Sequence, residues 1–394
     1  MQPDANWTDF LNTSLSNLDQ GNLRRRRVVT ETLAGHSILR SGKSLVNFGG
    51  NDYLGLRAHP AVLAAAAAAI ETNGVGSGAS PAVTGYSTAQ RSLERHLATF
   101  NKMPDALVFS SGFAGNLATL TSLADEGCTI FSDSLNHASL IDGCRLSRAA
   151  KVIYPHCNVD ALRQLLALKR QSTPRALIVT ESIFSMDGDA APLVELCELA
   201  ERFECGLIVD EAHATGVYGA TGSGLVEELQ LSHRVLAKLG TLSKAIGCLG
   251  GFVCGSEAIV EHVLNHGRSY MFSTALPSSV LVAANVALDW IHSLSERRHV
   301  LRTSAIALRE QLRSQGWQVL GYDSPIIPVI MGDESRALDA NHQLLASGLF
   351  VPAIRPPTVP AGTSRLRISL SSELSSEHIT RLVQVLEKLS SLQG

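Results

Sequence analysis

The sequence predicts an α/β fold in which a mostly parallel sheet is covered by helices on both faces, followed by a smaller α+β lobe. Between residues 89 and 254, helical segments alternate with short, almost continuously apolar strands. Strands of this kind are typical of a parallel sheet that is buried on both faces. The chain has 394 residues, too many for one simple core, which indicates more than one lobe.

The first part of the chain predicts a helix, a short strand and a second helix. Residues 8–27 are expected to form a helix that ends in four consecutive arginines, Arg24 to Arg27. Such a run is usually a solvated face or a contact between subunits. Residues 46–48 predict a strand, and residues 61–72, with six consecutive alanines, predict a helix.

A glycine-rich segment, Gly74–Ser80, contains the pattern G-x-G-x-G. The segment follows a helix, whereas the dinucleotide-binding fingerprint requires a preceding strand. The pattern therefore favours a tight loop that allows close approach of the backbone, and it argues against a dinucleotide cofactor.

The rest of the chain predicts the regular elements of the sheet and of the smaller lobe. The expected helices are residues 89–101, 112–124, 137–148, 159–169, 192–203, 280–315, 334–346 and 376–391. The expected strands are residues 106–109, 129–131, 151–154, 176–180, 206–209, 235–239, 250–254, 317–320, 326–330, 349–354 and 365–370. We expect an N-terminal segment over residues 1–50, a large domain over 51–282 and a small α+β domain over 283–394.

Composition and charge exclude several classes of protein. The net charge is −3, so no overall field attracts nucleic acid or an anionic membrane. Residues 270–288 carry no charge but include several polar side chains and a proline, which predicts a loop and a buried helix rather than a membrane span. The seven cysteines show no metal-binding spacing, and the N-terminus lacks the features of a signal peptide. We therefore expect no metal and a reducing, cytoplasmic location.

Polar residues follow five of the predicted strands. In a parallel sheet, ligands bind beyond the carboxyl ends of the strands. Each of these residues alone is more often a helix cap, a buried histidine or a solvated carboxylate, but together they favour a functional site. The groups are Ser110–Phe113, Ser132–His137, Glu181 with Ser185, Asp210–His213 and Thr241–Lys244.

These groups match the chemistry of pyridoxal phosphate (PLP). Ser110–Phe113 opens a helix, whose N-terminus can bind a phosphate. Lys244 follows an apolar strand, where a desolvated amine can act as a nucleophile and form a Schiff base. A carboxylate can keep the pyridine nitrogen of PLP protonated, and a flat side chain can stack on its ring.

An ATP-driven nucleic-acid enzyme is the alternative interpretation of Asp210–His213, which has the sequence of a helicase box. That interpretation requires a phosphate-binding Walker A loop. The nearest candidate is Gly42-Lys43-Ser44, but the position five residues before Gly42 is Ser37 instead of glycine. The sequence therefore argues against an ATPase.

Several motifs together resemble the α-oxoamine synthases, which are PLP enzymes of fold type I, like aspartate aminotransferase. The resemblance extends from about residue 24 to the C-terminus, with the motifs in the expected order. The motifs are Asn51–Leu56, Ser111–Ala114, His137–Ser139, Glu181–Asp189, Asp210–Gly216 and Thr241–Lys244.

Two further segments resemble the branch of this family that acts in biotin synthesis, namely Leu23–Arg26 and Ala353–Thr363. The resemblance implies a decarboxylative condensation of L-alanine with a pimeloyl thioester, giving 8-amino-7-oxononanoate, carbon dioxide and the free carrier. Whether the carrier is acyl carrier protein or coenzyme A stays open. The alternative is another branch, such as the 2-amino-3-ketobutyrate ligases, which use glycine and acetyl-CoA.

The resemblance also implies a role for individual residues. Lys244 would bind PLP covalently and transfer protons, Asp210 would pair with the pyridine nitrogen, and His137 would stack on the ring. His213 and Ser185 would contact the phenolic oxygen, and Gly112, Phe113 and Thr241 would hold the phosphate and nearby groups. Arg24, Asn51, Arg355 and Thr358 would bind substrate, with Arg24 favoured among the four arginines for the far carboxylate of the pimeloyl chain. A homodimer is expected, in which the loop Gly76–Ser80 and Thr274 reach the partner's site.

Overall fold

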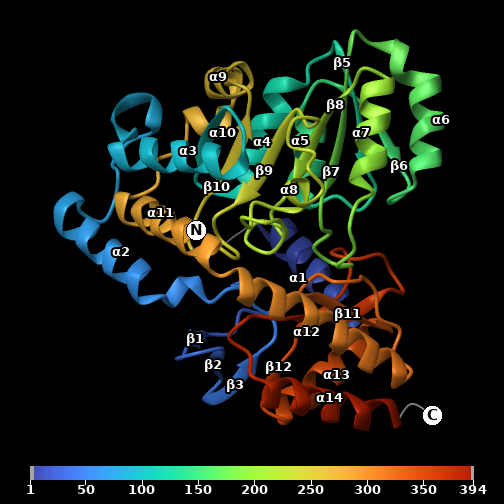
Figure 1. Cartoon of the computed structure of the whole chain (residues 1–394). Coiled ribbons are helices and arrows are strands. Elements are labelled where there is room, and N and C mark those ends of the chain that lie inside the picture. The colour runs from blue at the N-terminus through green and yellow to red at the C-terminus, as the bar shows by residue number, and fades with distance from the viewer. Residues whose placement is uncertain (1–3, 392–394) are drawn as a thin grey trace. The chain divides into compact units, whose positions relative to one another are not determined.

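The computed structural model describes residues 4–391, which its internal contacts divide into two units (Figure 1). The sheet unit comprises Asn51–Ser185 and Asp189–Arg302. The terminal unit comprises the described chain up to Gly50, the short segment Met186–Gly188, and the chain from Thr303 onward. The domains expected from the sequence over residues 51–282 and 283–394 stay a prediction, and the internal contacts place the second division at 302/303. The reason is that helix α11 (Ser278–Ser293) packs on α2 (Pro60–Asn73) and α3 (Thr88–Asn101) within the sheet unit.

The sheet unit is built on a seven-stranded sheet in the order β4-β10-β9-β8-β7-β5-β6. The pairs β9–β8, β8–β7, β7–β5 and β5–β6 are parallel, as the sequence predicts. Strand β10 is antiparallel to both of its neighbours, because only a short loop joins it to β9 and a parallel return would need a crossover of roughly a dozen residues or more. The strands are β4 (Asp105–Phe109), β5 (Cys128–Asp133), β6 (Ala150–Tyr154), β7 (Arg175–Glu181), β8 (Gly206–Asp210), β9 (Ala237–Thr241) and β10 (Gly251–Gly255).

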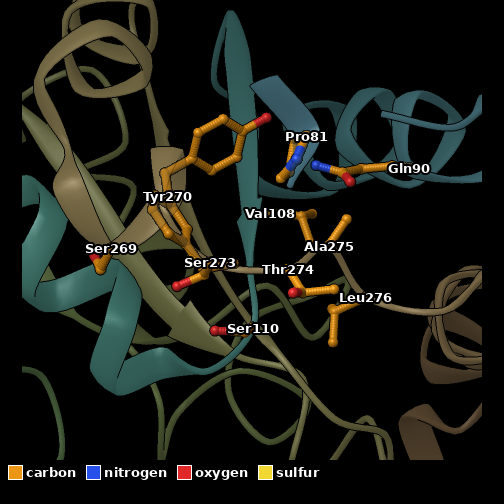
Figure 2. Close-up of a pocket in the computed structure, with 11 residues that line it drawn as sticks. Pro81, Gln90, Val108, Ser110, Ser269, Tyr270, Ser273, Thr274, Ala275 and Leu276 are labelled. Atoms are coloured by element: carbon orange, nitrogen blue, oxygen red, sulfur yellow. The ribbon is translucent and has the colours of Figure 1, made fainter. Parts of the chain in front are cut away.

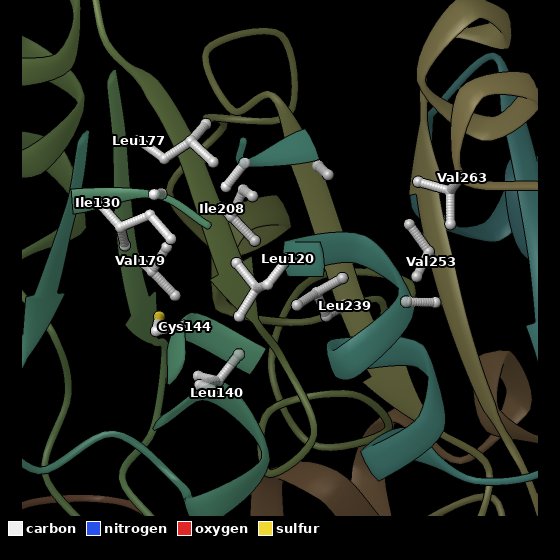
Figure 3. Close-up of a cluster of buried hydrophobic side chains, with 14 of the residues drawn as sticks. Leu120, Ile130, Leu140, Cys144, Leu177, Val179, Ile208, Leu239, Val253 and Val263 are labelled. Carbon is white, nitrogen blue, oxygen red and sulfur yellow. The ribbon is translucent and has the colours of Figure 1, made fainter. Parts of the chain in front are cut away.

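Helices cover this sheet and enclose its main core, a part of which Figure 3 shows. Leu120 of helix α4, Leu140 of α5 and Val263 of α9 pack with strand residues such as Val179 and Leu239 in one buried cluster. Fully burying one such side chain contributes roughly 1.5–3 kcal/mol. The remaining helices of the unit are α4 (Gly112–Leu123), α5 (Ala138–Leu146), α6 (Val159–Lys169), α7 (Leu193–Arg202), α8 (Leu225–Glu228), α9 (Glu257–His266) and α10 (Arg268–Met271), with the short turns η1 (Leu56–Ala58), η2 (Pro81–Gly85) and η3 (Arg170–Ser172).

The terminal unit contains two small sheets, of orders β1-β2-β3-β12 and β11-β14-β13. The parallel pair β3–β12 joins residues near the N-terminus to the C-terminal segment, which explains why they form one unit. Helix α12 (Ser295–Ser314) begins in the sheet unit and ends in the terminal unit. The other elements are α1 (Ala5–Gln20), β1 (Thr30–Thr32), β2 (Ser37–Arg40), β3 (Lys43–Asn47), β11 (Ile326–Gly332), α13 (Glu334–Ala346), β12 (Leu349–Phe350), β13 (Ala353–Ile354), β14 (Ser364–Ser369) and α14 (Ser376–Ser391).

The first helix is shorter than expected. Helix α1 ends at Gln20, and Arg24 to Arg27 lie in a segment without regular secondary structure after it, so the prediction of a helix to residue 27 is wrong. Gly21 caps the helix, and Asn22 adopts a left-handed conformation with φ of 55°, which ends the helical path.

Three further predictions about the C-terminal part need correction. The expected helix over 280–315 is divided into α11 and α12 at Leu294. The expected strand over 317–320 is reduced to a single bridge between Val319 and Val329. The expected strand over 349–354 is interrupted at Val351 and Pro352, because proline has no backbone N–H to donate to a strand.

No helix among residues 4–391 has the length and apolar character required to cross a membrane.

Candidate active site

Lys244 lies in the loop that connects β9 to β10. The amide of Leu242 donates to the carbonyl of Gly250 at 3.0 Å, and the amide of Cys248 donates to the carbonyl of Leu242 at 2.8 Å, which closes the loop on itself. Gly247 has φ of +74°, and a Cβ atom there would lie 2.3 Å from the backbone nitrogen of Arg57. Only glycine fits this position, so the backbone around Lys244 is tightly held.

The amine of Lys244 is oriented by a chain of polar side chains. Its Nζ atom lies 2.7 Å from Nε2 of His213, and Nδ1 of His213 lies 2.7 Å from the hydroxyl of Tyr53. The Tyr53 hydroxyl also contacts Oδ1 of Asn51 at 3.4 Å. Because His213 and Tyr53 are buried, this series of hydrogen bonds holds the lysine side chain in one direction.

Asp210 is the last residue of β8, and its side chain is buried. Its Oδ2 atom accepts a hydrogen bond of 2.7 Å from Nδ2 of Asn116 on α4, and its Oδ1 atom accepts one of 2.9 Å from the amide of Ala212. The Asn116 amide also donates to the hydroxyl of Ser139 at 2.8 Å. The two donors hold the Asp210 carboxyl group in one orientation.

The N-terminus of α4 lies close to the carboxyl end of β9 and to the first residue of β10. Ser111 caps the helix, and its Oγ atom accepts from the amide of Ala114 at 3.1 Å. A Cβ atom on Gly251 would lie 2.4 Å from Gly112, so this glycine allows the helix to approach the strand closely. The amides of Gly112 and Phe113, which have no acceptor within the helix, form a seat for a phosphate group.

His137 caps helix α5, and its Nδ1 atom lies 2.8 Å from the hydroxyl of Ser139. Glu181 ends β7, next to Asp210 on β8, and its side chain is buried. Thr241 ends β9, where its hydroxyl donates to the carbonyl of Gly250 at 2.9 Å. These residues complete the rim of one cavity.

The cavity has a volume of about 190 Å³, which is smaller than the ~300–1,000 Å³ of sites for drug-sized ligands and suits a small cofactor. It combines an amine, a buried carboxylate with two donors, an imidazole and the N-terminus of a helix. This donor set is the one that PLP requires, so the residues fit that cofactor. The lining residues are Ser111, Gly112, Phe113, Asn116, His137, Ser139, Glu181, Asp210, Ala212, Gly240, Thr241, Ser243 and Lys244.

The sequence-predicted site residues fall into two groups. Gly112, Phe113, His137, Asp210, Thr241 and Lys244 line the cavity. His213 contacts Lys244, Asn51 contacts Tyr53, and Ser185 is buried after β7 in the same unit. Arg24, Arg355 and Thr358 form the second group and belong to the terminal unit.

Within the terminal unit, an arginine neighbouring Arg24 contacts the predicted substrate residues. Nη2 of Arg25 lies 3.4 Å from the carbonyl oxygen of Arg355 and 3.3 Å from the hydroxyl of Thr358. Arg24 instead forms an ion pair with Asp19. Burial and the charge of Arg25 lower the pKa of Arg355, and a position next to a second cation favours binding of an anion there.

Asn116, Tyr53 and Glu181 were given no role from the sequence, although they contact or line the site. Asn116 had a detectable signal, since it lies one turn after Gly112 as a polar residue in a mostly apolar helix. Tyr53 and Glu181 lie within motifs that carry the family resemblance. Nothing in their spacing indicates that Tyr53 contacts His213 or that Glu181 is paired with Asp210 on the neighbouring strand.

A second cavity lies beside the phosphate seat, between Ser110 and residues such as Tyr270, Thr274 and Leu276 (Figure 2). Its volume is about 10 Å³, enough for roughly one water molecule. It is therefore a packing gap and not a ligand site. Next to it, the hydroxyl of Ser77 donates to the carbonyl of Ala275 at 2.6 Å, so the glycine-rich loop lies against the segment that contains Thr274.

One group of side chains in the described part of the chain, Asp133, His156 and Cys157, has the arrangement of a metal site. Nδ1 of His156 lies 2.9 Å from Asp133, and Nε2 lies 2.8 Å from Asp189. Burial lowers the pKa of His156, but the hydrogen bonds to Asp133, Asp189 and Cys157 outweigh it and raise the pKa to about 12. Both ring nitrogens of His156 therefore face a carboxylate, and we describe these side chains as an ion-pair cluster.

The cluster predicts a pH dependence of stability. Because the pKa of His156 is raised above its unfolded value of about 6.5, its contribution is complete below that pH and is lost progressively as the pH rises toward about 12. Replacing His156 with glutamine should therefore lower the free energy of unfolding most near pH 6 and less near pH 9. Urea denaturation at both pH values measures this difference.

The control for this prediction is His292→Gln, on the exposed surface of α11. It should show no such trend. A destabilisation by His156→Gln that is equal at pH 6 and pH 9 would contradict the ion-pair account.

The fold and the cavity together define a PLP-dependent enzyme of fold type I. Residues 43–386 match the family described as aminotransferase class I and II. The chain belongs to this family, and PLP is its cofactor.

Sequence relatives indicate which enzymes of this family the chain resembles. The chain is 44% identical over 388 residues to an 8-amino-7-oxononanoate synthase from Burkholderia cenocepacia, covering 97% of this chain and 98% of the relative. It is 45% identical over 383 residues to the enzyme of the same name from Burkholderia mallei, covering 94% and 95%. The resemblance to the α-oxoamine synthases is thus confirmed, and the chain is a PLP-dependent acyltransferase.

Solved structures agree with this class. A serine palmitoyltransferase variant from S. paucimobilis, with bound PLP and myriocin, has a TM-score of 0.92 at 30% identity, covering 99% of this chain and 100% of that one. An 8-amino-7-oxononanoate synthase from Francisella tularensis has a TM-score of 0.77 at 29% identity, covering 89% and 98%. The type I fold expected from the sequence is confirmed.

Proposed function

We propose that this enzyme condenses L-alanine with a pimeloyl thioester to give 8-amino-7-oxononanoate. The alanine α-carbon loses a proton and forms a bond to the acyl carbonyl carbon, and the thioester bond breaks to release the carrier thiol. The alanine carboxylate then leaves as carbon dioxide and is replaced by a proton. The proposal is supported by the identity of 44% over 388 residues to relatives of that name. The observation in the site that carries it is the Lys244 amine held against His213 in the cavity that Asp210 lines.

The residues of the cavity would hold PLP in a defined orientation. Lys244 would bind it covalently, Asp210 would pair with its ring nitrogen, and His137 would stack on its ring. His213 and Ser185 would contact its phenolic oxygen, and Gly112, Phe113 and Thr241 would bind its phosphate. When bound, PLP supplies an electron sink for the carbanion that forms at the alanine α-carbon.

Proton transfer is the part of the reaction assigned to Lys244. Its Nζ atom would remove the proton on the alanine α-carbon. His213, 2.7 Å away, orients this amine, and the Tyr53 hydroxyl in turn orients His213. A positioned base of this kind contributes typically 10²–10⁴-fold to the rate.

Residues of the terminal unit would recognise the two substrates. Arg355 would bind the alanine carboxylate, with Thr358 as a further substrate contact, and Asn51 of the sheet unit would also contact substrate. Support comes from the chemistry of Arg355, whose Nε atom has no hydrogen-bond partner among residues 4–391. Arg24 would bind the far carboxylate of the pimeloyl chain, because a bidentate arginine matches a carboxylate.

Alanine substitutions along the arginine run test this assignment. Arg24→Ala should raise the KM for the pimeloyl thioester by about 10–100-fold, which corresponds to the loss of a charged hydrogen bond of ~1.5–3 kcal/mol, with little change in the KM for alanine. Arg25→Ala should instead affect the KM for alanine, because Arg25 contacts the Arg355–Thr358 segment. Steady-state kinetics with each substrate varied in turn measures both values.

Arg26→Ala is the matched control, since its side chain is largely exposed. If Arg26 or Arg25 produced the large change in the KM for the thioester, the role of Arg24 would have to be reassigned. If Arg24→Ala changed the KM for alanine and the KM for the thioester equally, Arg24 would not be the residue that binds the pimeloyl carboxylate.

A homodimer is part of the proposal. Support comes from exposed apolar side chains around the glycine-rich loop and α10, namely Val75, Val83 and Phe272. We expect the loop Gly76–Ser80 and Thr274 to complete the partner's site, and light scattering to give twice the mass of the chain. A monomer with full activity at high dilution would contradict this.

We also place the enzyme in the cytoplasm, supported by seven free cysteines.

The experiment that tests the function is a substrate matrix with the product identified by mass spectrometry. Alanine and glycine are each combined with pimeloyl-CoA, pimeloyl-acyl carrier protein and acetyl-CoA. The proposal expects turnover with alanine and a pimeloyl thioester, and the two carriers decide which thioester is preferred. Turnover mainly with glycine and acetyl-CoA would assign the chain to the ligase branch instead.

A further inference from the structure

Glu181 lines the cofactor cavity, but the mechanism above gives it no role. We propose that Glu181 is a positioning residue that stays protonated beside Asp210, and so keeps the single negative charge of the pair on Asp210. This inference rests on the proposed contact between Asp210 and the ring nitrogen of PLP. It concerns the protonation of the cofactor and not the choice of acyl substrate.

The sheet brings the two carboxyl groups together. Strands β7 and β8 are parallel neighbours, and their register pairs Glu181 with Asp210. Paired residues on adjacent strands are about 4.8 Å apart and project from the same face. Both residues line the cavity, and their exposed fractions are only 3% and 5%. Two ionised carboxylates on paired positions of neighbouring strands, away from water, repel each other.

Their hydrogen bonds decide which of the two carries the charge. Asp210 accepts from Asn116 on one oxygen and from the amide of Ala212 on the other. Oε1 of Glu181 has no hydrogen-bond partner among the described residues, although it is buried. An ionised carboxylate without donors on one oxygen is costly in a buried position, whereas a protonated one is tolerated.

The surroundings of Glu181 also favour its protonated form. Burial and then the charge of Asp210 raise the pKa of Glu181 to about 8, and they outweigh the opposing effects of Lys244 and of the amides of His137 and Ser185. Glu181 is therefore mostly neutral at pH 7. When it ionises at higher pH, a second negative charge appears beside Asp210, and the pair no longer carries the single charge that the proposal assigns to it.

Other buried glutamates differ in their hydrogen bonds. Glu94 accepts from Tyr86, Gln90 and the amide of Val108, at 2.9–3.0 Å. Glu94 is not among the residues that line the cofactor cavity. It therefore provides a control for the general effect of neutralising a buried carboxyl group.

The first test is a pH titration of the cofactor absorption spectrum in the holoenzyme without substrates. The wild type should show a spectral transition as Glu181 ionises, and Glu181→Gln should lack it, because glutamine is neutral at every pH. Glu181→Met, which is also uncharged, should give the same loss if the glutamine variant fails to fold. Glu94→Gln should keep the transition. A transition that is unchanged in both Glu181 variants would overturn the proposal.

The second test is the pH profile of kcat. If only the neutral form of Glu181 supports the correct charge on Asp210, the ratio of kcat for Glu181→Gln to that of the wild type should rise by about tenfold between pH 7 and pH 9, since roughly one pH unit separates each value from the pKa. A purely structural role would lower kcat by the same factor at all pH values, which would contradict the proposal. The spectral test uses no substrate, so it can succeed even if the proposed acyl substrate is wrong.

Discussion

Replacing Lys244 with alanine is expected to lower kcat by at least about 10⁴-fold, because one side chain supplies both the covalent attachment and the base for proton transfer. The protein should still fold, since the loop is held by backbone hydrogen bonds that the substitution does not remove. Single-turnover kinetics measure the loss, and the absorption spectrum shows whether the cofactor is still covalently bound. Lys244→Arg should be equally inactive, because a guanidinium group does not lose its proton near neutral pH.

Lys151→Ala is the control, because Lys151 lies on the exposed edge of the sheet in β6. It should leave kcat unchanged. Activity of Lys244→Ala above about one tenth of the wild type would show that another group performs the proton transfer.

Replacing Asp210 with asparagine is expected to lower kcat by about 10²–10³-fold, because the ring nitrogen of the cofactor loses the charge that keeps it protonated. The KM values for both substrates should change much less, since Asp210 is proposed to contact the cofactor and not the substrates. The absorption spectrum of the holoenzyme should shift together with the loss of activity.

The variant Asn116→Ala leaves Asp210 in place but removes a hydrogen bond that positions it, so it distinguishes the effect of the charge of Asp210 from the effect of its position. Asn116 donates to Asp210 at 2.7 Å, so its removal should lower kcat by only about tenfold, the equivalent of one hydrogen bond of ~1.4 kcal/mol to a charged group. A larger decrease in kcat for Asn116→Ala than for Asp210→Asn would contradict this account.

Most of the cavity could be predicted from the sequence, because it depends on strand ends. Asp210 and Thr241 directly end apolar strands, and Lys244 follows three residues after β9. Parallel strands carry their carboxyl ends to one edge of the sheet, so residues far apart in sequence meet there. Periodicity therefore sufficed to bring the lysine, the aspartate and the phosphate seat together.

Contacts that depend on tertiary packing could not be predicted. The carboxyl pair of Glu181 and Asp210 follows from the register of β7 and β8, which no local pattern specifies. The position of Arg25 depends on how the chain continues after α1, whose end is signalled by Gly21 and Asn22 although the predicted helix extends past them. The antiparallel direction of β10 depends on the closure of the Lys244 loop by its own hydrogen bonds.

The central claim is that Lys244 is the residue to which the cofactor is attached. Reduction of the wild-type holoenzyme with borohydride, followed by proteolysis and mass spectrometry, tests it most directly. The account predicts one modified peptide, containing Lys244 and carrying the reduced cofactor in about one copy per chain. A modification on any other lysine, with an unmodified Lys244, would contradict the account.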